Sequence, residues 1–150
     1  MNKYVSSIDG FFKKKIKLVN LEFNKKNFSQ KNTILGKGNS ISQLPYVENF
    51  NSIELNVSKE FFIDKKKQLV TVSGNAKISD VHNFLLKNKY YCHYFPSYPL
   101  VTVGACIANG THGIIPKKGI FTDFVEEIEL YNPNFGKKIL SKSKNKKIFE

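Results

Sequence analysis

Two glycine-bearing stretches contain the residues whose types and spacing best suit ligand binding, and the longer one reads VTVGACIANGTHG over residues 101–113. Small side chains let a bulky group approach the main chain, and glycine also adopts positive φ angles. The stretch therefore predicts a tight turn that forms a ligand-facing wall, while a loop packed on its own core is the alternative. Its small residues are Gly104, Ala105, Ala108, Gly110 and Gly113.

The segment before this turn, Phe95–Pro99, contains two prolines. Proline fixes φ and lacks an N–H donor, and it also restricts the residue before it, so the segment should be extended and rigid rather than helical. A stiff approach to a turn with few side chains suits a planar or phosphorylated ligand lying against the main chain.

The other glycine-bearing stretch, Gly36–Ser40, reads GKGNS and follows the short apolar run Thr33–Leu35. This order predicts a strand that enters a tight loop. Successive backbone N–H groups around two glycines can form an anion-binding concavity, to which Lys37 would add charge and Ser40 a hydroxyl donor. An ordinary turn is the alternative reading of so short a motif.

Other reactive side chains give weaker signals. His82 is expected off the apolar face of a helix and exposed to solvent, and His93 is expected in a buried strand with a hydrogen-bonded ring. No third group is evident that would orient a Cys/His dyad. Cys92 and Cys106 are too few for a disulfide framework and no zinc-ligand spacing is present, so reduced thiols and no metal are expected.

Composition limits the class of protein. The 150 residues suit one domain, 41% of them are hydrophobic, and the net charge is +12 without a single arginine. Specific nucleic-acid recognition relies on the guanidinium group, so the lysines fit a solvated surface better, although attraction to anionic ligands stays open. No signal peptide and no long apolar segment is evident, which makes the cytoplasm the expected location.

An α+β arrangement should position the two glycine-bearing stretches, with a helix packed on a sheet. Residues 78–89 predict the clearest helix, with Ile78, Val81 and Leu85 on one face. The carboxylates Glu126, Glu127 and Glu129 lie on an expected strand, where cross-strand pairing with lysines is simpler than acid–base chemistry. Strands are expected at 33–35, 52–57, 60–63, 68–73, 90–95, 124–131 and 137–140, less clearly at 16–23, and a further element should begin at 147–149.

Taken in order, Gly36–Ser40, the strand pair, the helix and Pro96–Gly113 resemble the FAD-binding domain of the vanillyl-alcohol-oxidase, or PCMH, type. The second stretch is most similar to the sugar-lactone oxidases and the decaprenylphosphoryl-ribose 2-oxidase group. The resemblance implies mixed sheets flanked by helices and a domain incomplete at its C-terminus. It also implies that residues 1–32 are an N-terminal basic segment that is part of the domain, that residues 33–150 are a truncated FAD-binding domain, and that a substrate domain is absent.

The same resemblance implies a role for each loop. The first would wrap the FAD pyrophosphate, and the second would line the ribityl chain and flavin, with Ala105 standing where the family usually has glycine. Many relatives attach FAD covalently through a histidine in the first loop, where this chain has Asn39, so noncovalent FAD is expected. The implied cofactor-binding residues are Gly36, Lys37, Gly38, Asn39, Ser40, Ile41, Pro96, Ser97, Tyr98, Thr102, Gly104, Ala105, Ala108, Asn109, His112 and Gly113.

The implied function is that of an FAD-dependent oxidoreductase, or its N-terminal fragment, that oxidises an alcohol group of a sugar, sugar lactone or polyol-like substrate by hydride transfer to flavin. No catalytic residue is assigned: His112 would lie near the flavin as a hydrogen-bonding or positioning group, and a loop-stabilising histidine is the alternative. A missing C-terminal half or a partner chain would then be needed. The alternatives are a noncatalytic remnant that binds FAD or another nucleotide, and a basic protein that binds nucleic acid or an anionic surface.

Overall fold

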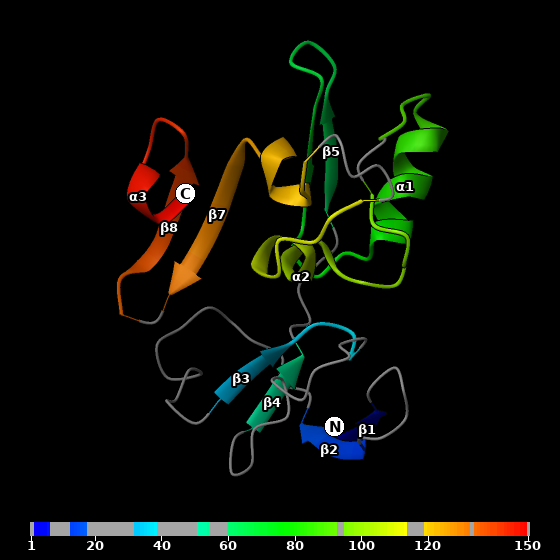
Figure 1. Cartoon of the computed structure of the whole chain (residues 1–150), viewed down its shortest axis with the longest axis vertical. Coiled ribbons are helices and arrows are strands. Elements are labelled where there is room, and N and C mark those ends of the chain that lie inside the picture. The colour runs from blue at the N-terminus through cyan, green and yellow to red at the C-terminus, as the bar shows by residue number, and fades with distance from the viewer. Residues whose placement is uncertain are drawn as a thin grey trace.

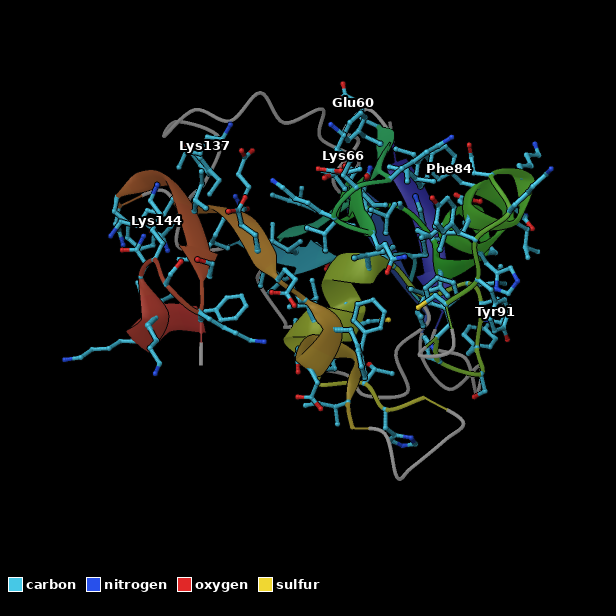
Figure 2. All side chains as sticks on the ribbon, turned by 90° about the horizontal axis from the view of Figure 1, so that it is seen from above. Glu60, Lys66, Phe84, Tyr91, Lys137 and Lys144 are labelled. Carbon is cyan, nitrogen blue, oxygen red and sulfur yellow. The ribbon has the colours of Figure 1, made fainter. Side chains whose placement is uncertain are left out.

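The structure is a computed structural model that describes residues 2–6, 13–17, 32–38, 51–54, 60–92, 95–113, 119–132 and 134–149 (Figure 1). Its helix α2 lies centrally, between α1 on one side and the β7–β8 hairpin on the other (Figures 1 and 2). The elements are β1 (Asn2–Ser6), β2 (Lys13–Lys17), β3 (Asn32–Leu35), β4 (Asn51–Glu54), β5 (Phe61–Asp64), β6 (Leu69–Val72), α1 (Ile78–Lys87), α2 (Val103–Ala108), the 3-10 helix η3 (Phe121–Phe124), β7 (Glu127–Asn132), β8 (Gly136–Ser141) and α3 (Lys146–Phe149).

The strands of the described ranges form four two-stranded sheets, and these confirm the α+β expectation. Three pairs are antiparallel, whereas β3 and β4 are parallel with Ile34 opposite Ile53. The predicted β5–β6 hairpin is present, with Phe61 opposite Val72 and the lysine-rich turn at its tip. Residues 18–23 and 55–57, also expected as strands, lie outside the described residues.

Helix α1 forms where its apolar periodicity predicts. Ile78, Val81 and Leu85 are buried, and Phe84 stacks on Phe61 of β5 with ring centroids 5.1 Å apart (Figure 2). The helix ends at residue 87 rather than 89, because Lys89 has φ of 64° and the chain reverses there.

The main core joins both helices to the β5–β6 hairpin. Its buried members come from α1, from α2 and from the segment between β6 and α1, and the partly buried Phe61, Ile63 and Val72 pack against them from the hairpin. The helix therefore packs on strands, as expected. The buried residues of this cluster are Ala76, Ile78, Val81, Leu85, Val103 and Cys106.

Two expectations around the end of α1 are wrong. Residues 90–92 form no strand, and Tyr91 is 59% exposed, because the reversal at Lys89 turns the chain away from the sheet. His82 is half-buried rather than fully exposed, and its ring lies 5.5 Å from that of Tyr91 and 5.6 Å from that of Phe95. His93 lies outside the described residues.

The expectation of a simple turn at residues 101–113 is also wrong, because this stretch contains α2. Thr102 caps the helix by accepting a hydrogen bond from Ala105, and Val103 and Cys106 are buried on its inner face. The glycines and alanines suggested a loop, but a side-chain cap and two buried apolar residues stabilise a short helix.

The C-terminal hairpin confirms the predicted pairing of residues 124–131 with 137–140, with shifted boundaries. Residues 121–124 form η3, and β7 starts at Glu127. The Nζ of Lys137 lies 2.8 Å from Oε2 of Glu129. The expected cross-strand pairing of a strand glutamate with a lysine is therefore confirmed at Glu129. The element expected at 147–149 is the short helix α3.

No helix among the described residues is long and apolar enough to cross a bilayer.

Candidate functional site

A strip of backbone hydrogen bonds fixes the start of α2 against the start of α1. The N–H of Ile78 donates to Val101 O at 2.9 Å, and the N–H of Val103 donates to Ala76 O at 2.9 Å. Thr102 and Lys77 form an antiparallel bridge between these bonds. The predicted helix therefore positions the second glycine-bearing stretch directly through its own N-terminal end.

Gly104 is in contact with the backbone of Gly74. Its N–H donates to Gly74 O at 2.8 Å, and a Cβ on Gly104 would lie 3.0 Å from that same oxygen. The small side chain at this position is thus required by packing inside the protein. The sequence predicts small residues here either for the approach of a ligand or for packing on the protein's own core, and the contact with Gly74 supplies the packing reason at residue 104.

The backbone N–H groups that open α2 are engaged by the protein itself. Val103 donates to Ala76 O, Gly104 donates to Gly74 O, and Ala105 donates to the Oγ1 of Thr102 at 3.3 Å. These donors are therefore not directed at an anion.

The first loop meets the second at Gly36. A Cβ on Gly36 would lie 3.0 Å from Thr102 Oγ1 and 3.8 Å from the Cβ of Ala105. The residue two positions on, Gly38, is buried and has φ of 74°, a left-handed conformation that favours glycine. The structure thus brings the two glycine-bearing stretches together, although they are more than 60 residues apart in the sequence.

The remaining predicted site residues divide between packed and open positions. Pro96 is buried and Lys37 and Gly113 are half-buried, whereas Ser97, Tyr98, Ala108, Asn109 and His112 are exposed. Asn109 caps the end of α2 through a hydrogen bond from Nδ2 to Ala105 O of 3.0 Å. The end of α2 and the residues after it therefore form the open part of the candidate site. Asn39, Ser40 and Ile41 lie outside the described residues.

Cys106 is the buried reactive group nearest to this site along the chain. Cys106 is 1% exposed. This burial raises the pKa of its thiol, and a hydrogen bond with Thr111 offsets part of the rise by lowering the pKa. The thiol is therefore protonated at neutral pH and serves as a core side chain. Neither cysteine forms a disulfide, and no cluster of potential metal ligands occurs among the described residues.

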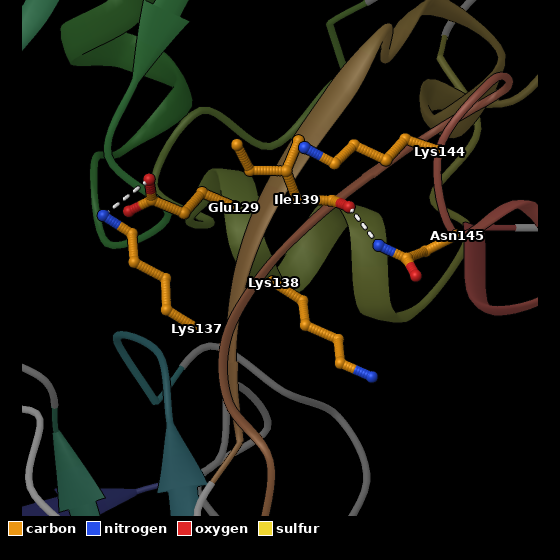
Figure 3. Close-up of a pocket in the computed structure, with 6 residues that line it drawn as sticks. All are labelled: Glu129, Lys137, Lys138, Ile139, Lys144 and Asn145. Carbon is orange, nitrogen blue, oxygen red and sulfur yellow. Dashed lines mark hydrogen bonds and ion pairs between the residues drawn. The ribbon is translucent and has the colours of Figure 1, made fainter.

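A surface groove of about 440 Å³ lies away from these loops, on the β7–β8 hairpin (Figure 3). Glu129 and Lys137 form their ion pair at one side, and Asn145 donates to Ile139 O at 2.7 Å. None of the predicted site residues lines this groove. Its lining is Glu129, Lys137, Lys138, Ile139, Lys144 and Asn145.

Comparison with known families identifies the kind of domain that contains the two loops. The family model of the FAD binding domain matches residues 22–137. This range includes both glycine-bearing stretches and the helices α1 and α2. The chain belongs to the FAD-binding domain family. Its cofactor is FAD, as the resemblance implied.

Solved structures show the same fold for this FAD-binding domain. Cholesterol oxidase from B. sterolicum superimposes with a TM-score of 0.70 at 10% sequence identity, over 93% of this chain. The match covers 32% of the cholesterol oxidase chain, so the present chain spans about a third of that protein. No curated protein sequence matches significantly.

The described residues of the FAD-binding domain fit such a cofactor. The left-handed glycine at residue 38 and the absence of a side chain at Gly36 leave the first loop with little but main chain where it meets α2. A cofactor that carries a pyrophosphate is commonly bound by the main chain of a glycine-containing loop. The residues of the first loop are therefore of the type that this group requires.

Proposed function

We propose that the chain is the cofactor-binding part of an FAD-dependent oxidoreductase that oxidises an alcohol group of a sugar, sugar lactone or polyol-like substrate. The observation that supports this most directly is the contact of Gly36 with Thr102 and Ala105, because it joins the two loops that the function requires. The family membership supplies the cofactor, and FAD, when bound, supplies a flavin ring that accepts hydride.

In this proposal the first loop, residues 36–41, binds the pyrophosphate. Gly38 gives the loop its left-handed residue, and Lys37 adds a positive charge close to the bound phosphates. The N–H groups at the start of α2 are engaged within the protein, which supports assigning the phosphates to the first loop and not to the start of this helix.

The second stretch lines the ribityl chain and the flavin ring. Pro96, Ser97 and Tyr98 form one side and the residues from Thr102 to Gly113 form the other. The exposure of Ala108, Asn109 and His112 supports a ligand-facing role for the end of α2 and the residues that follow. His112 is a positioning group beside the flavin rather than an assigned acid or base, and its Nδ1 lies 3.2 Å from Gly113 O.

The attachment of FAD is noncovalent, because the first loop has Asn39 where related proteins carry the linking histidine. The domain assignment remains that of the sequence: an N-terminal segment at 1–32 and an FAD-binding part at 33–150. Further polypeptide, on the same chain or a partner, supplies the substrate-binding residues, which accords with the chain spanning a third of cholesterol oxidase. The two thiols outside any disulfide support a cytoplasmic location.

FAD titration of the purified chain tests the proposal, with a pair of glycine variants as probe and control. Gly38 and Gly136 have φ of 74° and 72°, so alanine strains both backbones similarly. Gly136 is the first residue of β8, and a Cβ there would have open space around it. We expect Gly38→Ala to weaken FAD binding at least tenfold and Gly136→Ala to leave it unchanged.

Three outcomes separate the alternatives. A wild-type chain that fails to bind FAD, or an equal loss in both variants, overturns the proposed site. Flavin that stays on the polypeptide after acid precipitation overturns noncovalent attachment. A yellow protein whose flavin is not reduced by sugars, lactones or polyols, even in the presence of polypeptide that supplies substrate-binding residues, favours the noncatalytic remnant.

A further inference from the structure

The end of the second cofactor loop is held by a separate segment, residues 119–123. The N–H of Phe121 donates to Thr111 O at 2.8 Å, and Ile120 forms an antiparallel bridge with His112. Two consecutive residues of the loop are thus paired with two consecutive residues of this segment. The residues that join the two strips lie outside the described part of the chain.

Ile120 also lies beside Gly110, in the turn that follows α2. Gly110 has φ of 54°, and a Cβ at that position would lie 3.7 Å from the Cδ1 of Ile120. The position of Ile120 therefore influences Gly110 through packing and His112 through the backbone bridge.

Asp123 fixes Ile120 in turn. Its Oδ2 accepts the N–H of Ile120 at 2.8 Å, across the first turn of η3. Gly119, just before Ile120, has φ of 92°, and a Cβ there would overlap the Asp123 carboxylate. The carboxylate thus occupies space that only glycine leaves open.

We propose that Asp123 and Gly119 are positioning residues for His112 and Gly113 at the flavin. This rests on the proposed function, because it takes the 102–113 stretch to line the cofactor. Asp123 acts through Ile120: its carboxylate holds the Ile120 N–H, and Ile120 fixes the backbone of His112. Losing the carboxylate should free the loop end while leaving the main core, made by α1, α2 and β5, in place.

Asp64 provides a matched control. Its Oδ1 accepts the N–H groups of Lys66 and Lys67 at 3.0 and 3.1 Å, so it also holds a backbone turn, but at the tip of the β5–β6 hairpin. The variants are Asp123→Ala, Asp123→Asn, which retains an acceptor oxygen, and Asp64→Ala. Each is examined by amide hydrogen exchange without FAD and by FAD titration.

In the absence of FAD, we expect Asp123→Ala to speed exchange at the Phe121 amide about tenfold, with Asp64→Ala without effect there. With FAD, Asp123→Ala should weaken binding about tenfold and alter the visible circular dichroism of the bound flavin, and Asp123→Asn should restore most of both. Gly119→Ala should reproduce the effects of Asp123→Ala, because the added Cβ would displace the Asp123 carboxylate.

Faster exchange in Asp123→Ala without a change in FAD affinity or flavin dichroism would overturn the positioning role, and so would unchanged exchange. Failure of Asp123→Asn to rescue would overturn the role of the acceptor oxygen. Failure of the wild-type chain to bind FAD would instead overturn the proposed function, and the exchange measurement would still report whether Asp123 holds the loop.

Discussion

Gly104 and Gly74 are joined by a hydrogen bond of 2.8 Å between N–H and carbonyl, in a contact that leaves little room for a side chain at Gly104. The first glycine belongs to α2 and the second to the segment between β6 and α1. Their contact holds the second glycine-bearing stretch against the segment that leads into α1. It is a packing constraint of the kind expected if this stretch packs on the protein's own core.

Substitution of Gly104 tests this constraint. Alanine is favoured over glycine in a helix by up to about 1 kcal/mol, but overpacking usually costs about 1–3 kcal/mol. We expect Gly104→Ala to lower the free energy of unfolding by about 1 kcal/mol and Gly104→Val to lower it further, measured by urea denaturation. Ala108→Ser, at an exposed position of α2, is the control. A more stable Gly104→Ala protein would contradict the close contact with Gly74.

The hydroxyl of Thr102, as well as the shape of its side chain, should contribute to the stability of the folded protein. It is buried, and its Oγ1 accepts the N–H of Ala105 at 3.3 Å. Loss of an N-cap costs about 1 kcal/mol, so Thr102→Val, which keeps the shape, should lose about that much stability. Thr102→Ser retains the acceptor and should keep most of the capping contribution. Thermal unfolding measures the stability of both variants. A larger loss in Thr102→Ser than in Thr102→Val would show that the methyl group contributes more stability than the cap.

Burial of the Cys106 thiol should make the free energy of unfolding depend on pH. The folded-state pKa is raised by burial, so the unfolded thiol ionises first, near its ordinary pKa of about 8.5. Its contribution is fully present below that pH and is lost as the pH rises toward the folded pKa. Comparison of wild type with Cys106→Ala from pH 7 to 10 should show the wild type losing more stability.

Thiol labelling supplies an independent check on the same group. With iodoacetamide at pH 8, we expect Cys92, which is half-buried, to react well before Cys106. Mass spectrometry of the digested protein assigns the label. Equal labelling of both cysteines in the folded chain would contradict the burial of Cys106.

The β7–β8 hairpin should depend on its buried face and not on its ion pair. The side chains of Lys137 and Glu129 are 64% and 60% exposed, and exposed pairs contribute about 0–1 kcal/mol. Glu129→Gln should therefore change stability by less than about 0.5 kcal/mol in moderate salt. Leu140, 3% exposed on the same hairpin, should cost about 2–5 kcal/mol when replaced by alanine. A larger loss in Glu129→Gln than in Leu140→Ala, by urea denaturation, would reverse this assignment.

The sequence alone determined the elements whose apolar periodicity is regular. Ile78, Val81 and Leu85 recur at helical spacing and predicted α1, and the β-branched residues beside the lysine-rich turn predicted the β5–β6 hairpin. The two glycine-bearing stretches and their order resemble the FAD-binding domain, and the family match confirms that domain.

Only the tertiary structure decided what the small residues contact. Whether Gly36 faces Thr102, and whether Gly104 faces Gly74 or a ligand, depends on pairing between segments far apart in the chain. The α2 helix was missed because its stability comes from the Thr102 cap and from burial of Val103 and Cys106 rather than from residue propensities. The link from Asp123 through Ile120 to His112 was likewise invisible, since it exists only where two strips of backbone lie side by side.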